Sequence, residues 1–289
     1  MANRAVMLIG HQQLWKDFVA QVDAKKLHHA QLFLGPKGVG KTKFALELAA
    51  YLQGVAEHPI EKTQLFRGLD ADTLLFLDEG EMLPIEKVRG MLARSGQSHA
   101  RPYLIVILED LGRLKVEAMN TLLKTLEEPG EDVFFFLTAN KEEDVLPTIR
   151  SRCHMTSFNL VDKQSLELAC DGHVQTEALV SFAMGRPGKL RRLLEDSEYF
   201  ALHQTMAQDV QLFLVNPRAS QAFALVRKYE NDPHTEELLD ILLARARTYL
   251  LQGPAWTRFL EHIEDAKADL KHNVNRRLVL ENLFLTLAL

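Results

Sequence analysis

The residues of this chain with the clearest chemical meaning lie at positions 35–42, which read GPKGVGKT. This segment has the pattern of a phosphate-binding loop, a glycine followed after any four residues by Gly-Lys-Thr. The backbone N–H groups of such a loop surround phosphate oxygens. Lys41 would reach the β- and γ-phosphates, and the Thr42 hydroxyl would bind Mg²⁺. A glycine-rich turn without a ligand is the alternative interpretation. The residues expected to bind ATP are Gly35, Pro36, Lys37, Gly38, Val39, Gly40, Lys41 and Thr42.

A pair of carboxylates follows the apolar run LIVIL, at Glu109 and Asp110. A phosphate loop needs one acid at a strand end to hold Mg²⁺ and a further acid to orient the attacking water. We assign Glu109 to the metal and Asp110 to catalysis. Their order, Glu then Asp, is the reverse of the usual arrangement in hydrolytic enzymes, so nucleotide binding should survive better than hydrolysis. The alternative is a solvated charge pair at the end of a strand.

The spacing of apolar residues predicts the elements that position these groups. Short apolar runs bounded by charged or turn residues predict strands near residues 31–35, 72–80, 103–110 and 132–140. Helical periodicity predicts helices at 41–54, at 85–96 with an end at Gly96, and at 115–130. This alternation predicts a parallel sheet with helices on both faces. From about residue 161 onward, apolar residues recur at helical spacing, and the segment GRPG at 185–188 divides that helical half.

Composition limits the classes of function. With 34 Lys and Arg against 39 Asp and Glu, the net charge of −5 argues against a whole-surface grip on nucleic acid. The N-terminus has no apolar run long enough for a signal peptide or a membrane span, so we expect a cytoplasmic protein without a membrane partner. The two cysteines exclude a disulfide framework. Cys153 with His154 and Cys170 with His173 lack the usual ligand spacing, so no zinc is expected.

Several longer segments resemble a known family. The motifs are GHQQLWKDF, the phosphate loop, LPIEKVRGML, NTLLKTLEEPGEDVFFFLTAN and LPTIRSRC, which together cover about the first half of the chain. They resemble the bacterial clamp-loader subunits of the AAA+ ATPases, most closely the delta-prime-like subunits of DNA polymerase III. The resemblance implies an AAA+ P-loop domain at residues 1–153, a small helical lid at 154–197 and an all-α collar domain at 198–289.

The resemblance also implies roles for two further residues. Arg152, in the triplet SRC, corresponds to an arginine finger that enters the nucleotide site of a neighbouring subunit. Asn140 corresponds to a sensor that binds the γ-phosphate or the attacking water. Without the resemblance, Arg152 reads as a surface arginine and Asn140 as the end of a strand. Two features depart from the family: Gly188 stands where the lid carries a sensor arginine, and positions 51–72 lack the four-cysteine zinc module.

These features together predict a clamp-loader subunit that helps to load a sliding clamp onto primed DNA. It would bind ATP and Mg²⁺ within a hetero-oligomeric ring and give Arg152 to its neighbour, with little or no ATPase activity of its own. The whole assembly would belong to a DNA-directed DNA polymerase holoenzyme. A hydrolysing, gamma/tau-like motor subunit stays open as an alternative, because the phosphate loop and Asn140 are present. A stand-alone P-loop enzyme would leave SRC and LLKTLEEP unexplained.

Overall fold

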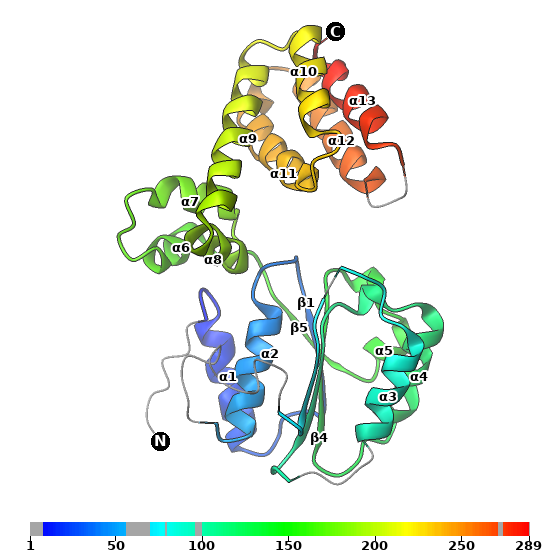
Figure 1. Ribbon diagram of the computed structural model, residues 1–289. Helices are drawn as coiled ribbons and strands as arrows, with labels where there is room; N and C mark the ends of the chain where they lie inside the picture. The colour runs from blue at the N-terminus through cyan, green and yellow to red at the C-terminus, as the bar shows by residue number, and fades with distance from the viewer. Residues whose placement is uncertain (1–7, 56–69, 79, 96–99, 271–273, 289) are drawn as a thin grey trace. The chain divides into compact units, whose positions relative to one another are not determined.

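The computed structural model describes residues 8–55, 70–78, 80–95, 100–270 and 274–288 of the 289-residue chain (Figure 1). The chain divides into two compact units, Met1–Arg191 and Arg192–Leu289. The first unit contains the α/β domain with the phosphate loop, and the second is helical.

The first unit is organised around a five-stranded sheet in which all neighbouring strands are parallel. The order across the sheet is β2-β3-β4-β1-β5, so β1, which precedes the phosphate loop, lies between β4 and β5. Because the strands are parallel, their carboxyl ends meet at one edge, where α/β proteins bind ligands. The strands are β1 Ala30–Leu34, β2 Thr73–Phe76, β3 Leu104–Leu108, β4 Val133–Ala139 and β5 His154–Ser157.

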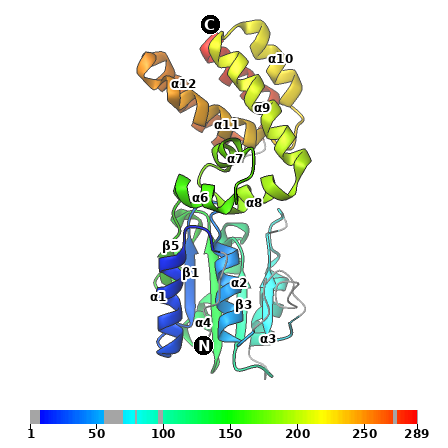
Figure 2. The ribbon, with the colours of Figure 1, turned by 90° about the vertical axis from the view of Figure 1, so that its left-hand side faces the viewer.

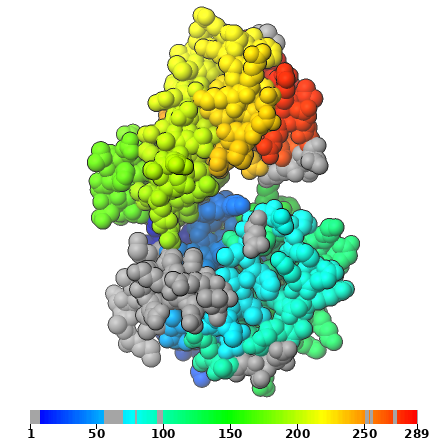
Figure 3. Space-filling model, in the orientation of Figure 1, coloured from blue at the N-terminus to red at the C-terminus, as the bar shows by residue number. Residues whose placement is uncertain are grey.

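Helices cover both faces of this sheet, as the sequence predicted (Figures 1 and 2). Helices α1 and α2 lie on one face, and α3, α4 and α5 lie on the other. The outer side of α3 is exposed, and the cyan atoms in Figure 3 mark this part of the surface. The helix bounds are α1 Gln12–Asp23, α2 Lys41–Leu52, α3 Ile85–Ser95, α4 Val116–Glu127 and α5 Pro147–Arg150, with short 3-10 turns at η2 Leu111–Arg113 and η3 Glu142–Asp144.

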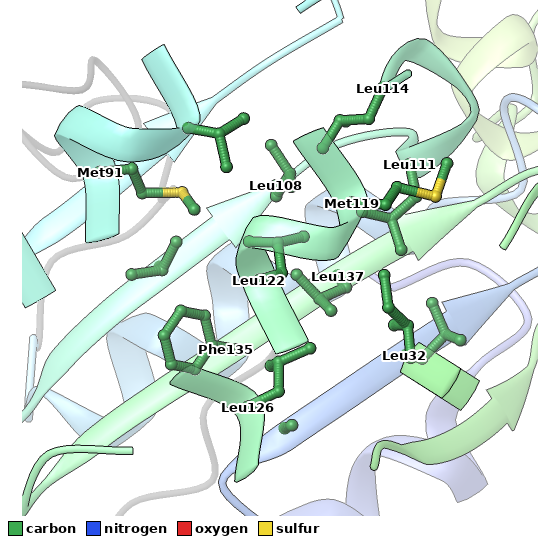
Figure 4. Packing of buried hydrophobic residues seen from close by; sticks show 14 of the residues in the cluster. Leu32, Met91, Leu108, Leu111, Leu114, Met119, Leu122, Leu126, Phe135 and Leu137 are labelled. Atoms are coloured by element: carbon green, nitrogen blue, oxygen red, sulfur yellow. The ribbon is translucent and has the colours of Figure 1, made fainter. Parts of the chain in front are cut away.

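Each face has its own hydrophobic core. On the α4 side, Met119, Leu122 and Leu126 recur at helical spacing and pack on Phe135 and Leu137 of β4 (Figure 4). Burying one such side chain contributes about 1.5–3 kcal/mol. Helix α4 ends at Glu127, two residues before Pro129, which cannot continue a helix.

The opposite core is aromatic. Phe33 of β1 packs edge-to-face with Phe18 of α1, Phe44 of α2 and Phe158, at centroid distances of 5.8, 5.5 and 5.5 Å. Phe44 lies on α2 two residues after the phosphate loop, and all four rings are at most 2% exposed. This cluster therefore ties the start of α2 to the sheet.

Strand β5, like helix α1, is an element that the apolar pattern did not predict. It reads HMTS, and none of its four residues is buried, so it lacks the apolar run typical of a central strand. It nevertheless pairs with β1, with Gln31 opposite His154. The sheet thus extends four residues beyond position 153, where we expected the α/β domain to end. The predicted helix end at Gly96 lies outside the described residues.

Three helices follow β5, namely α6 Lys163–Ala169, α7 Thr176–Ala183 and α8 Pro187–Glu195. They occupy the segment expected to form the lid. The division between the two compact units falls inside α8, after Arg191.

The second unit contains helices α9 to α13. Its core includes four neighbouring residues of α11, which are at most 2% exposed: Leu238, Leu239, Ile241 and Leu242. Phe213 of α9 and Phe284 of α13 pack edge-to-face at 5.2 Å. None of the helices that the structure describes is long and apolar enough to cross a bilayer. The helices are α9 Ser197–Val215, α10 Ala219–Tyr229, α11 Thr235–Ala246, α12 Pro254–Asp269 and α13 Arg276–Ala288, with a 3-10 turn at η4 Arg247–Gln252.

Candidate nucleotide-binding site

The loop 35–42 leaves the carboxyl end of β1 and leads into α2, so its N–H groups surround the start of that helix. Gly35 has a φ of +149°, and a Cβ there would lie 2.1 Å from the Phe158 carbonyl oxygen. Gly40 has a φ of +104° and precedes Lys41, the first residue of α2. Residues with a side chain rarely adopt these backbone conformations, so the path of the loop requires glycine at both positions.

Lys41 is buried in this loop and crosses to the end of β4. Its Nζ donates to the carbonyl oxygens of Gly35 and Pro36, at 2.5 and 3.0 Å, and to Oδ1 of Asn140 at 3.2 Å. Burial lowers the pKa of Lys41 to about 8, although Asp110 and Glu109 oppose this shift. The ammonium is therefore charged at neutral pH, but it loses its proton more readily than an exposed lysine does.

Thr42 and Glu109 meet at the position that sequence reasoning assigned to the metal. The Thr42 hydroxyl donates to Oε1 of Glu109 at 2.5 Å, and the Asp78 backbone N–H donates to Oε2 at 2.8 Å. Arg113 donates from Nη2 to the Glu109 carbonyl oxygen at 2.7 Å. A hydroxyl and a carboxylate are the hard oxygen ligands that Mg²⁺ prefers, so these two residues fit such an ion.

Asp110 and Asn140 form a second pair beside the metal position. Asn140 Nδ2 donates to Oδ2 of Asp110 at 2.7 Å, while its Oδ1 accepts from Lys41. Asp110 adopts a φ of +56°, and its backbone N–H donates to Oγ1 of Thr138 at 2.9 Å. Burial raises the pKa of the Asp110 carboxyl above its usual value. A left-handed backbone at a non-glycine residue is strained, and here it turns the carboxylate toward Asn140.

These groups line a cavity of about 210 Å³. This volume is below the ~300 Å³ typical of whole small-molecule sites, so it suits a phosphate chain, with the rest of a nucleotide outside it. A larger cavity of about 570 Å³ lies beside β2 and α3, but its lining is largely apolar and contains no phosphate-loop residue. The smaller cavity is lined by loop residues together with Lys43, Asp78, Glu109, Asp110, Thr138, Asn140 and Gly188.

Gly188, the second residue of α8, lies directly on the phosphate loop. Its N–H donates to the Gly38 carbonyl oxygen at 2.8 Å, and a Cβ at Gly188 would lie 3.1 Å from that oxygen. The position expected for a lid arginine is therefore in close backbone contact with the loop and carries no charge.

Arg152 lies away from this cavity, just after α5. Its Nη1 donates to the Thr148 carbonyl oxygen at 2.8 Å, and its Nη2 pairs with Glu127 at the end of α4. The Arg152 side chain is 30% exposed. The structure thus brings the loop, Glu109, Asp110 and Asn140 together and leaves Arg152 outside the cavity.

Sequence reasoning missed two charged residues of the site. Asp78 follows β2, and its Oδ2 lies 3.0 Å from Nζ of Lys37. Arg113 follows Glu109 by four residues and also lies 3.5 Å from Asp78. Asp78 could have been found by the argument used for Glu109, because it too follows an apolar strand at the carboxyl edge of the sheet.

The side chains of His11 and Cys153 also have perturbed pKa values; His11 supports the phosphate loop, and Cys153 bears on metal binding. The Nε2 of His11 donates to the Val39 carbonyl oxygen at 2.9 Å, and burial lowers the pKa of His11, which keeps the ring neutral. Burial raises the pKa of the Cys153 thiol to about 12, so it is protonated at neutral pH. Among the described residues, no three His, Cys, Asp or Glu side chains are grouped to hold a metal ion.

Comparisons with known proteins bear on the family and the fold of this chain. The sequence profile of the family described as "DNA polymerase III, delta subunit" matches residues 10–162, more than half of the chain. The DNA polymerase III subunit gamma of Buchnera aphidicola is 27% identical over 90% of this chain and 77% of its own length. The subunit tau of Escherichia coli is 27% identical over 76% of this chain, which spans only 37% of the length of that protein.

A solved structure shares the fold. It is a DNA polymerase III gamma subunit-related protein from Thermotoga maritima, with a TM-score of 0.56 and 17% identity. The match covers 94% of this chain and 98% of the other.

Proposed function

Because this chain belongs to the DNA polymerase III delta-subunit family, we propose that it is a subunit of the complex that loads the sliding clamp onto primed DNA. Within that complex it would bind ATP and Mg²⁺ at the phosphate loop and contribute Arg152 to a neighbouring subunit. The other subunits, the clamp and primed DNA would be its partners.

The convergence of groups on the 210 Å³ cavity carries this proposal. Lys41 supplies a cation, Thr42 and Glu109 supply oxygen ligands, and the loop supplies N–H donors, which are the groups that hold a nucleotide phosphate chain. When bound, Mg²⁺ neutralises charge on the phosphates. Thr42 and Glu109 would hold it there.

Arg152 is partly exposed and lies outside the phosphate cavity of this chain, which supports a role as an arginine finger at the site of a neighbouring subunit. A finger of this kind stabilises charge on the transferring phosphoryl group, so it has to be accessible to another subunit. The helices α6–α8 would form the lid, and the helices from about residue 198 onward would form the collar that holds the ring together.

Two features favour a subunit that holds nucleotide and turns it over slowly. The Glu109–Asp110 order places the longer side chain on Thr42, and Gly188 brings no cation to the phosphates. One observation favours a second candidate, a subunit that hydrolyses ATP at its own site. Asp110 and Asn140 form a hydrogen bond at the cavity wall, where an attacking water would be oriented.

The deciding experiment is to measure ATP binding and turnover by the purified chain alone, and then with the other subunits, the clamp and primed DNA. If the purified chain alone binds ATP without hydrolysing it, and the mixture hydrolyses ATP only when Arg152 is present, the results would support the nucleotide-holding subunit. If assembled complexes that contain the Asp110→Asn or Glu109→Gln variant lose ATP turnover, the result would favour a subunit that hydrolyses ATP at its own site. A chain that binds no nucleotide under either condition would contradict the proposed ATP site.

A further inference from the structure

The phosphate loop carries a second lysine, Lys37, whose contacts differ from those of Lys41. The Lys37 side chain is 81% exposed and reaches from the loop to the end of β2, where Nζ lies 3.0 Å from Oδ2 of Asp78. Both residues line the 210 Å³ cavity. Partial burial disfavours the charged form of Lys37, but the carboxylates of Asp78, Glu109 and Asp110 together outweigh this effect and raise the pKa of Lys37.

Asp78 is largely enclosed, with 13% of its side chain exposed. Its Oδ1 accepts from the Gly80 N–H at 2.9 Å and lies 3.5 Å from Nε of Arg113. Burial opposes ionisation of Asp78, yet the Gly80 N–H and the Lys37 ammonium lower its pKa below the usual value. Asp78 thus has two further partners besides Lys37, the Gly80 N–H and Arg113.

The position of this ion pair points to one part of a nucleotide. The Asp78 backbone N–H donates to Glu109, which accepts the Thr42 hydroxyl on its other oxygen. The Lys37 ammonium is thus next to the side of the cavity that fits Mg²⁺. If Thr42 and Glu109 hold Mg²⁺ there, the charge of that ion would favour the terminal phosphates on this side of the cavity.

We propose that Lys37 is a second phosphate-binding lysine, which recognises the terminal phosphate of a nucleoside triphosphate, and that Asp78 competes with this phosphate for it. The inference rests on the proposed nucleotide site. An ion pair whose lysine is 81% exposed is weak in water, so a more highly charged phosphate can displace Asp78 from Lys37. Lys37 would then supply, from the loop, a cation that Gly188 does not supply from the lid.

Competition of this kind has a measurable consequence for specificity. Lys37 reaches the triphosphate end, so it should strengthen binding of MgATP more than binding of MgADP. Removing the Asp78 charge should free Lys37 and tighten MgATP binding, but only while Lys37 is present.

The test is calorimetric titration of the full chain with MgATP and with MgADP, for the variants Lys37→Ala, Asp78→Asn and their double mutant. Lys37→Ala should weaken MgATP about fivefold and MgADP less than twofold, the range expected for an exposed charge-assisted contact. Asp78→Asn should tighten MgATP about threefold and have no effect in the Lys37→Ala background. Lys16→Ala, at an exposed position of α1, controls for loss of one positive charge and should change neither affinity.

Two results would overturn the inference. The first is an equal change for MgATP and MgADP in Lys37→Ala, or no change for either. The second is a tightening by Asp78→Asn that persists without Lys37, since this would be a general charge effect. Lys41→Ala keeps the two proposals apart: if it leaves nucleotide binding intact, or if the unaltered chain does not bind, the site itself is wrong. Circular dichroism confirms that each variant is folded.

Discussion

The phosphate cavity and the surroundings of Arg152 show two ways of holding a charged side chain. Lys41 is buried and donates to two carbonyl oxygens and one amide oxygen. Arg152 is 30% exposed and is held by a backbone carbonyl and by Glu127, a carboxylate that is itself half exposed. Burial fixes the first group and lowers its pKa, whereas the second group is only partly buried.

This difference indicates where each group does its work. A buried, multiply bonded lysine is preorganised for a ligand that enters its own cavity. Arg152 is partly exposed and its ion-pair partner Glu127 is half exposed, so in the proposed role it would exchange Glu127 for a phosphate presented by another subunit. The proposed roles in cis and in trans therefore correspond to two different degrees of burial.

The largest expected effect, and the clearest difference between the two regions, comes from Arg152→Ala. We expect DNA-stimulated ATPase activity of the assembled complex to fall by about 1,000-fold, the scale typical of a lost arginine finger. Nucleotide affinity of the isolated chain should be unchanged, because Arg152 lies outside its cavity. Steady-state turnover with a gel-filtration check of assembly measures this, and unchanged turnover would remove the finger assignment.

Lys41→Ala should produce the opposite profile. Loss of a charge-assisted contact inside the cavity should weaken MgATP binding by the isolated chain by about 100-fold. Assembly through the second unit should persist. Fluorescence titration with a labelled nucleotide checks the affinity, and a variant that binds as well as the unaltered chain would show that the loop is not the site.

The depressed pKa of Lys41 adds a pH dependence that Arg152 should not share. Phosphate binds the protonated ammonium, so the contribution of Lys41 is complete well below pH 8 and is lost as pH rises through about 8. The dissociation constant for MgATP should rise about tenfold between pH 7 and pH 9. Calorimetry in buffers of different ionisation enthalpy should detect proton uptake at pH 8 that is absent in Lys41→Ala. A flat profile would contradict the assigned contact.

The smallest expected effect concerns the lid. Gly188→Ala would place a Cβ 3.1 Å from the Gly38 carbonyl oxygen, so it should weaken nucleotide binding about threefold by displacing the loop. Gly90→Ala is the matched control, because its Cβ meets nothing within 4 Å. That variant should stabilise α3 by about 0.5–1 kcal/mol without changing affinity. Similar behaviour of both variants in urea unfolding and nucleotide titration would show that the contact is unimportant.

Sequence patterns predicted the elements that are buried and periodic. The apolar runs marked β1 to β4, and helical spacing marked α2, α3 and α4, because the core selects their residue types. Strand β5 escaped this reasoning because its exposed residues carry no such signal. Glu109 and Asp110 were assigned to the site because they end an apolar strand beside a phosphate-loop motif, whereas Asn140 was assigned only through the resemblance to the clamp-loader family.

The contacts within the site could not be predicted in the same way. That Asn140 joins Asp110 to Lys41 depends on the strained backbone at Asp110, which no residue type specifies. The Lys37–Asp78 pair joins the loop after β1 to the end of β2. It depends on the strand order β2-β3-β4-β1-β5, which composition does not encode.

The hydrogen bonds of the cavity also bear on how the chain folds. Thr42 and Glu109 are 67 positions apart in sequence, and Lys41 and Asn140 are 99 positions apart. Closing such long loops is entropically costly, and contacts of high sequence separation slow folding. The phosphate pocket therefore exists only in chains whose sheet is complete. A ligand that binds this pocket stabilises the finished domain by mass action, so saturating nucleotide should raise its melting temperature and protect β3 and β4 from hydrogen exchange together.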